Sequence, residues 1–177
     1  MGMPLSLLRL QDEAYAVIEM GANHAGEIAY LTHIARPDIA LLNNAGRAHL
    51  EGFGSLEGVA HAKAEIMQGL SEDGLFVYNA DDHFADLWRG LSADYQTATF
   101  GVQQTATVHS PAESYRIEWL EQGFVASFDV YTPNDRFKVK LQLAGEHNRL
   151  NALAAITACD ALGISRQSMV QGLAALS

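Results

Sequence analysis

The chain has 177 residues, of which 11 are Lys or Arg and 21 are Asp or Glu, giving a formal net charge of −10 at pH 7. This length suits one domain with a small appendage, and 49% hydrophobic residues indicate a globular chain. Because nucleic acids and anionic membranes are bound by clustered Lys and Arg, the acidic balance argues against both partners. No apolar run is long enough to span a membrane, and the single cysteine, Cys159, fits a reducing cytoplasm.

The first half of the chain alternates short apolar runs with helical patterns. Buried strands are predicted at 15–20, 38–43 and 74–79, and helices at 27–35, 55–70 and about 82–91. Strands that alternate with helices favour right-handed crossovers. The pattern therefore predicts an α/β fold with a mostly parallel sheet flanked by helices.

A different pattern follows over residues 97–143, where apolar and polar residues alternate with period two. Such alternation is typical of antiparallel strands with one face in water, so a small antiparallel β-subsheet is predicted here. The aromatic residues in this range, among them Trp119 and Phe128, are expected to form its core.

The last part of the chain returns to helix. The stretch 147–162 is rich in Ala and Leu, and Gly163 after it is a suitable C-terminal cap. Ser165 can cap a final helix that runs to about Leu176.

A phosphate-binding loop of the Gly-Lys-Ser/Thr type is not found in this sequence. The three lysines, Lys63, Lys138 and Lys140, follow alanine, phenylalanine and valine. Any phosphate-binding site within these 177 residues therefore needs other groups.

The first candidate site is Glu19-Met-Gly-Ala-Asn-His24, which begins at the end of the first predicted strand. Ligands of open parallel sheets gather outside the carboxyl ends of the strands, which places Glu19 where a metal or phosphate site would lie. A carboxylate that caps a nearby backbone amide is an equally good interpretation of Glu19 from its position alone.

The second candidate site follows the next strand and includes His49 and Glu51. These two side chains are expected at the same edge of the sheet as Glu19, where a carboxylate and an imidazole could hold a divalent ion. Mg²⁺ prefers oxygen ligands, whereas Mn²⁺ and Zn²⁺ accept histidine more readily.

The third candidate is Lys63, which falls on the apolar stripe of the helix predicted at 55–70. A lysine in such a place can extend its amine to water, pair with a carboxylate, or lose its charge. A neutral amine could react with CO₂, and the resulting carbamate could bind a metal as a carboxylate does.

The fourth candidate lies at the start of the helix predicted at 147–162. His147, Asn148 and Asn151 occupy its first turn, where helix N-termini favour polar and anionic groups. Asparagine amides suit the donor and acceptor edges of a purine, and ordinary N-capping by Asn148 is the simpler alternative.

Taken together, four segments resemble the Mur ligase family: Glu19-Met-Gly-Ala-Asn-His, Ala48-His-Leu-Glu-Gly-Phe-Gly-Ser, Ala62-Lys-Ala-Glu-Ile and Gly145-Glu-His-Asn-Arg-Leu-Asn. The similarity covers nearly the whole chain. The segment with His-Leu-Glu-Gly-Phe-Gly-Ser resembles in particular the members that add D-alanyl-D-alanine to UDP-N-acetylmuramoyl-tripeptide. The Gly-x-His-Asn-x-x-Asn segment is shared with the related folate ligases.

This resemblance implies a cytoplasmic, ATP-dependent amide-forming ligase of three domains that acts through an acyl phosphate in peptidoglycan synthesis. Residues 1–177 would be part of its central domain, without the UDP-binding and C-terminal domains. The implied cofactors are ATP and two Mg²⁺ ions, and the substrates are UDP-N-acetylmuramoyl-tripeptide and D-alanyl-D-alanine. We expect this chain to be a monomer. We also expect it to be inactive alone, because it lacks the phosphate-binding loop.

The resemblance also implies roles for single residues. Glu19 and His49 match positions that hold Mg²⁺, and Lys63 matches a lysine that is carbamylated and supports the second metal. His147, Asn148 and Asn151 match the stretch that meets adenine.

A further matched stretch, Asn23 and His24, lies near the substrate and the phosphates in that family.

Three alternatives remain open from the sequence. The chain could come from a folate ligase or another amino-acid ligase of the same superfamily. It could be a non-catalytic module that binds nucleotide. It could also be a metal hydrolase built on Glu19, His49 and Glu51.

Overall fold

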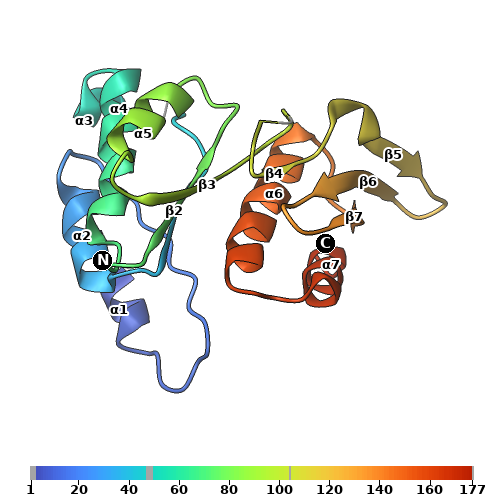
Figure 1. The fold of residues 1–177 in the computed structure, drawn as a ribbon, viewed down its shortest axis with the longest axis horizontal. Helices are drawn as coiled ribbons and strands as arrows, with labels where there is room; N and C mark the ends of the chain where they lie inside the picture. Colours follow the sequence, from blue (N-terminus) through green and yellow to red (C-terminus); the bar gives the residue numbers. More distant parts are fainter. Residues whose placement is uncertain (1–2, 47–49, 104, 177) are drawn as a thin grey trace. The chain divides into compact units, whose positions relative to one another are not determined.

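The computed structural model describes residues 3–46, 50–103 and 105–176, which form two compact units (Figure 1). The first unit contains Met1–Phe76 and Asp86–Gln96. The second contains Val77–Ala85 and Thr97–Ser177.

Helices dominate the first unit. Its elements are α1 (Met3–Leu7), α2 (Glu27–Ala35), β1 (Ile39–Leu42), α3 (Leu50–Phe53), α4 (Leu56–Ala64), the 3₁₀ helix η1 (Glu65–Gly69), the beginning of β2 (Leu75–Asn79) and nearly all of α5 (Ala85–Leu91). Strand β2 lies beside β1. Val59, Ala60, Phe76 and Trp88 are fully buried and form the centre of this unit.

Close packing between α2 and η1 depends on Gly69. A Cβ atom at Gly69 would lie 2.3 Å from the carbonyl carbon and oxygen of Thr32, so only glycine allows this approach. The Thr32 hydroxyl donates a 2.8 Å hydrogen bond to the carbonyl of Ile66 and fixes the contact.

The second unit contains the rest of β2, the remaining strands and the last two helices. Its strands are β3 (Gln96–Gly101), β4 (Val108–His109), β5 (Arg116–Trp119), β6 (Phe124–Tyr131) and β7 (Arg136–Leu141), with a 3₁₀ turn, η2, at Ala112–Ser114. Strand β3 lies beside β2 and pairs with β4 in parallel; β6 pairs antiparallel with β4, β5 and β7. Helices α6 (Glu146–Ala161) and α7 (Arg166–Ala174) complete the unit.

The predicted fold class, α/β with a mostly parallel sheet flanked by helices and a small antiparallel part, is confirmed. The period-two pattern correctly gives β5, β6 and β7: along β7, Phe137, Val139 and Leu141 are buried, and the residues between them are exposed. The pair β3–β4 is parallel, so antiparallel pairing does not extend over all of residues 97–143. Of the two aromatic residues expected in the subsheet core, Phe128 is fully buried but Trp119 is 77% exposed.

The helix boundaries follow their capping residues. Helix α2 has the predicted bounds, and the helix predicted at 55–70 forms as α4 followed by η1. The Ser55 hydroxyl caps α4 by accepting a bond from the amide of Gly58, and Ser165 caps α7 in the same way. Gly163 follows α6 in the left-handed conformation, as predicted.

The strand predicted at 15–20 is wrong. This segment is extended but belongs to no sheet, and the side chain of Val17 is fully exposed. An apolar run becomes a buried strand only where neighbouring strands satisfy its backbone and cover its faces. Within the described residues no strand does this for 15–20.

None of the helices in the described part of the chain combines the length and apolar character needed to span a bilayer.

Candidate functional site

The loop before α2 is held in place by the first residue of that helix. The Glu27 carboxylate accepts hydrogen bonds from the backbone amide of Asn23 at 2.7 Å and that of His24 at 3.3 Å, and it also contacts the His24 ring at 3.3 Å. The Asn23 amide, followed by the His24 ring and amide, lowers the pKa of the Glu27 carboxyl because each interaction favours its charged form. Asn23 and His24 therefore have a defined backbone geometry.

A second carboxylate fixes the same loop from η1. Glu65 accepts hydrogen bonds from the amide of Gly26 at 2.8 and 3.0 Å and from the amide of Ala29 at 3.2 Å. These amides belong to the first turn of α2, whose positive end favours a negative charge. Gly26 has a φ of 85°, a conformation that glycine adopts without strain.

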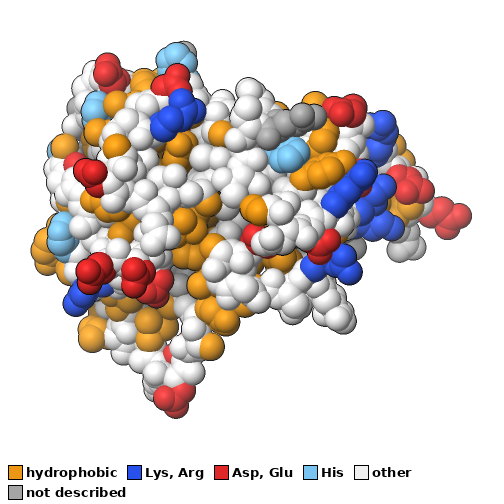
Figure 2. Space-filling view, viewed as in Figure 1, with side chains coloured by type: hydrophobic (Ala, Val, Ile, Leu, Met, Phe, Trp, Pro, Cys, Tyr) orange, Lys and Arg blue, Asp and Glu red, His pale blue; other side chains and the backbone are white. Residues whose placement is uncertain are grey.

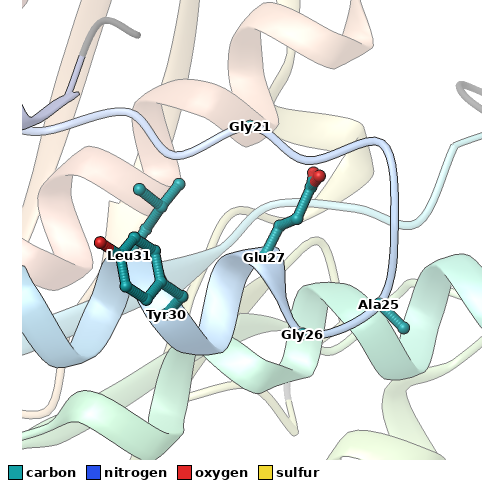
Figure 3. Close-up of a pocket in the computed structure, with 6 residues that line it drawn as sticks. All are labelled: Gly21, Ala25, Gly26, Glu27, Tyr30 and Leu31. Atoms are coloured by element: carbon teal, nitrogen blue, oxygen red, sulfur yellow. The ribbon is translucent and has the colours of Figure 1, made fainter.

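An open hollow of about 500 Å³ lies along this loop and the start of α2, lined by Gly21, Ala25, Gly26, Glu27, Tyr30 and Leu31. Figure 3 shows the Glu27 side chain extending from the helix toward the loop, with Tyr30 and Leu31 further along the same helix. The hollow exposes loop backbone that a ligand could approach.

Gly52 in α3 brings two of the sequence segments together. A Cβ atom at Gly52 would lie 1.8 Å from the carbonyl oxygen of Asn23 and 3.8 Å from the His24 ring. The segment that contains Asn23 and His24 therefore packs directly against the segment around Gly52, which lies 29 residues after Asn23 in the chain. Glycine is required here because no side chain fits.

Replacing Gly52 by alanine is expected to displace the Asn23–His24 loop and to destabilise the chain by about 1–3 kcal/mol, the usual cost of overpacking. Urea unfolding of the two chains measures this difference. Gly90→Ala is the matched control, because Gly90 lies in α5 with no atom near its missing Cβ and should change stability little. Equal stability of the Gly52 and Gly90 variants would show that the loop adapts without cost.

Lys63 lies on α4 with its amine directed to the loop after β1. Its Nζ atom donates a 2.7 Å hydrogen bond to the carbonyl of Asn44, and the side chain is half-buried. Its neighbours on the predicted stripe, Val59 and Met67, are buried, so Lys63 does belong to the packed face of the helix.

The proposed metal ligands are only partly described. Glu19 is exposed and extends from the unpaired segment 15–20, so its interpretation as the end of a buried strand is wrong. His49 and the Glu51 side chain lie outside the described residues. Among the residues that are described, no three His, Cys, Asp or Glu side chains gather closely enough to hold a metal. Glu19, His49 and Lys63 therefore remain a predicted set.

In the second unit, Gly145 shapes the entry to α6. Its φ is 106°, and a Cβ atom there would lie 2.8 Å from the His147 ring. His147 and Asn151 are exposed on the first turns of the helix, and Asn148 is half-buried. The Asn148 side-chain amide donates a 2.9 Å hydrogen bond to the carbonyl of Ala144, so Asn148 does not cap the helix; Gly145 occupies the cap position.

Arg149 is a residue of this region that sequence reasoning missed. It is only 2% exposed, forms an ion pair with Glu146, donates to the carbonyl of Pro111 at 3.3 Å and lies over the Tyr115 ring. The Tyr115 hydroxyl in turn accepts a 2.8 Å hydrogen bond from the amide of Gly145. These contacts fix the start of α6; the only sequence signal was the Glu146–Arg149 spacing of three residues.

Comparison with known proteins shows the family of this chain. Residues 1–159 match the family described as Mur ligase middle domain. The UDP-N-acetylmuramoyl-tripeptide–D-alanyl-D-alanine ligase of Escherichia coli K12 is 42% identical over 176 residues, which are 99% of this chain and 38% of that ligase. The chain thus spans well under half the length of this relative.

Solved structures give the same result. A crystal structure of MurF from Acinetobacter baumannii matches 98% of this chain and 37% of its own with a TM-score of 0.88 and 36% identity. The MurF ligase of Thermotoga maritima, solved in complex with ADP, matches 98% of this chain and 39% of its own with a TM-score of 0.81 and 31% identity. With the family match over most of its length and these similarities in sequence and fold, the chain belongs to the Mur ligase family, whose middle domain it carries.

Proposed function

We propose that this chain supplies ATP- and metal-binding residues to a ligase that adds D-alanyl-D-alanine to UDP-N-acetylmuramoyl-tripeptide in peptidoglycan synthesis. The observation that carries the proposal is the packing of Gly52 against the carbonyl of Asn23. It brings together two of the four sequence segments by which the chain resembles these ligases. The relatives that carry this activity by name support the choice of reaction.

In this proposal Lys63 acts as a carbamate. Its neutral amine forms a C–N bond with CO₂ and releases one proton, and the carbamate keeps one N–H group. That N–H can still donate to the Asn44 carbonyl, so the observed hydrogen bond is compatible with the modification. The carbamate, Glu19 and His49 would hold Mg²⁺, which when bound neutralises charge on the phosphates.

The start of α6 is proposed to bind adenine. The Asn148 Nδ2 group is engaged by the Ala144 carbonyl, which leaves Oδ1 as an acceptor for an exocyclic amine. His147 and Asn151 are exposed beside it. The Arg149 network keeps this turn rigid, which reduces the entropic cost of binding.

Asn23 and His24 are proposed to lie near the phosphates and the substrate. Their loop is fixed by the Glu27 and Glu65 carboxylates. In the ligation, the terminal carboxylate of the tripeptide takes the γ-phosphoryl group of ATP to form an acyl phosphate, and ADP leaves. The D-alanyl-D-alanine amine then attacks the acyl carbon, the amide bond forms, and phosphate and a proton are released.

A chimera tests this proposal: the 176 matching residues of the Escherichia coli ligase are replaced by this chain. We expect phosphate release that requires both the muramyl tripeptide and D-alanyl-D-alanine. A folded chimera that releases no phosphate, beside an active parent, would contradict the proposed function. The chain alone is expected to show no ligation, because Gly-Lys-Ser/Thr is missing from its sequence.

A further inference from the structure

Strand β5 is an edge strand with exposed side chains. It pairs with β6 on one side, and within the described part of the chain no strand lies on its other side (Figure 1). All four of its residues are exposed, including Ile117 at 41% and Trp119 at 77%. Edges of this kind offer free backbone groups for pairing with another strand.

The hydrogen-bond phase of β5 shows which backbone groups face this free edge. The amide of Leu120 bonds to the carbonyl of Gly123 at the end of the hairpin, so Leu120, Glu118 and Arg116 direct their backbone groups to β6. The residues between them, Ile117 and Trp119, therefore present their N–H and C=O groups to the free edge.

The sequence of β5 is self-complementary about Ile117. In an antiparallel pair of two such strands centred on Ile117, the two Ile117 residues exchange both backbone hydrogen bonds. Arg116 of each strand then lies opposite Glu118 of the other, on the same face and at the closer, non-hydrogen-bonded spacing. Two cross-strand ion pairs form together, and within the four residues of β5 no like charges lie directly opposite each other.

The Arg116 side chain already lies near this edge. Its guanidinium donates to the carbonyls of Glu113 and Tyr115 at 2.5 and 2.8 Å. By the same alternation, the Tyr115 carbonyl faces the free edge, as the backbone groups of Ile117 and Trp119 do. The guanidinium has five N–H donors, so others remain for a carboxylate. Figure 2 shows side chains of both charge signs around this hairpin, as a self-complementary surface requires.

We propose that β5 pairs with β5 of a second copy of this chain, forming a two-fold symmetric dimer through a continuous antiparallel sheet. On the face opposite the ion pairs, Ile117 packs against its symmetry mate and each Trp119 lies beside the partner strand. A four-residue strand buries less than the roughly 1,200 Å² of a stable interface, so the dimer is weak and reversible. This differs from the monomer expected from the sequence.

Charge reversal tests the pairing by sedimentation equilibrium over a roughly hundredfold range of concentration. The wild-type chain is expected to shift from monomer to dimer, and Arg116→Glu alone or Glu118→Arg alone to weaken the dimer at least about tenfold. The variant with both changes restores the opposite-sign pairs and should dimerise as the wild type does. An equimolar mixture of the two single variants should form a heterodimer.

Several results would overturn the proposal. A wild-type chain that stays monomeric throughout removes the dimer, and a dimer equally strong in both single variants places the interface elsewhere. Failure of the double variant or of the mixture to recover dimerisation would exclude the Ile117-centred register. Circular dichroism of each variant shows whether it is folded, and a dimer held by these exposed pairs should weaken as salt is raised.

Discussion

Replacing Lys63 by alanine in the chimera is expected to lower ligase turnover by about 10- to 100-fold, in line with the loss of a group that supports a bound metal. The reason is chemical rather than structural. Alanine cannot form a carbamate, so the predicted set of Glu19, His49 and Lys63 loses one anionic ligand. Added bicarbonate should not recover the activity of this variant, whereas depleting CO₂ should lower the activity of the unchanged chimera.

Two controls separate this role from a role in folding. Lys140→Ala removes a lysine that is exposed on β7, and it should leave turnover unchanged. In the chain alone, Lys63→Ala removes the hydrogen bond to the Asn44 carbonyl, which contributes about 0.5–1.5 kcal/mol of stability, so the chain should stay folded. Turnover at the level of the unchanged chimera would show that Lys63 serves packing alone.

Local signals in the sequence accounted for most elements of the fold. The serines before α4 and α7 and the glycine after α6 set helix ends because capping depends on residues close in the chain. The period-two alternation of β7 correctly predicted which of its residues face the core. The helix predicted to start at about residue 82 shows the limit of such signals: the Asp82 carboxylate accepts a hydrogen bond from the amide of Phe84, and α5 begins only at Ala85.

The failures concern contacts between distant residues. The run 15–20 is mostly apolar, but whether it forms a strand depends on partners that composition does not reveal. Trp119 has the alternation of a core residue, yet it lies on an edge strand beside a hairpin, where its ring meets that of Phe124 edge-on. Strand position within a sheet, which sets burial, is a property of the whole topology.

The candidate site shows the same division. The segments around Glu19, Lys63 and Asn148 could be proposed from the sequence because residue types at fixed spacings carry the family resemblance. Their physical connections were not predictable: Glu65 reaches an amide 39 residues away, and Gly52 meets the carbonyl of Asn23. Arg149 was missed because a buried arginine has no sequence signature apart from a nearby carboxylate.

Trp88→Ala is expected to destabilise the chain by about 3–5 kcal/mol, the usual cost of removing a buried tryptophan. Trp88 is fully buried in the first unit, and its indole N–H donates a 3.2 Å hydrogen bond to the carbonyl of Ala60 in α4. Its loss leaves a large cavity between α5 and α4, which the surrounding helices can fill only in part. Since whole domains are stable by about 5–15 kcal/mol, this one change removes a large share of the total.

The second tryptophan makes the test specific. Trp119→Ala removes a side chain that is 77% exposed, so its effect on the free energy of unfolding in dilute solution should stay within about 0.5 kcal/mol. Each variant also retains a single tryptophan, Trp119 in the second unit or Trp88 in the first, whose fluorescence follows that unit during urea unfolding.

If Trp88→Ala left the urea midpoint unchanged, the packing of α5 against α4 would not stabilise the first unit. If Trp88→Ala lowered the midpoint reported by Trp119 as well, the two units would unfold cooperatively, since the substitution lies in the first unit and the probe in the second.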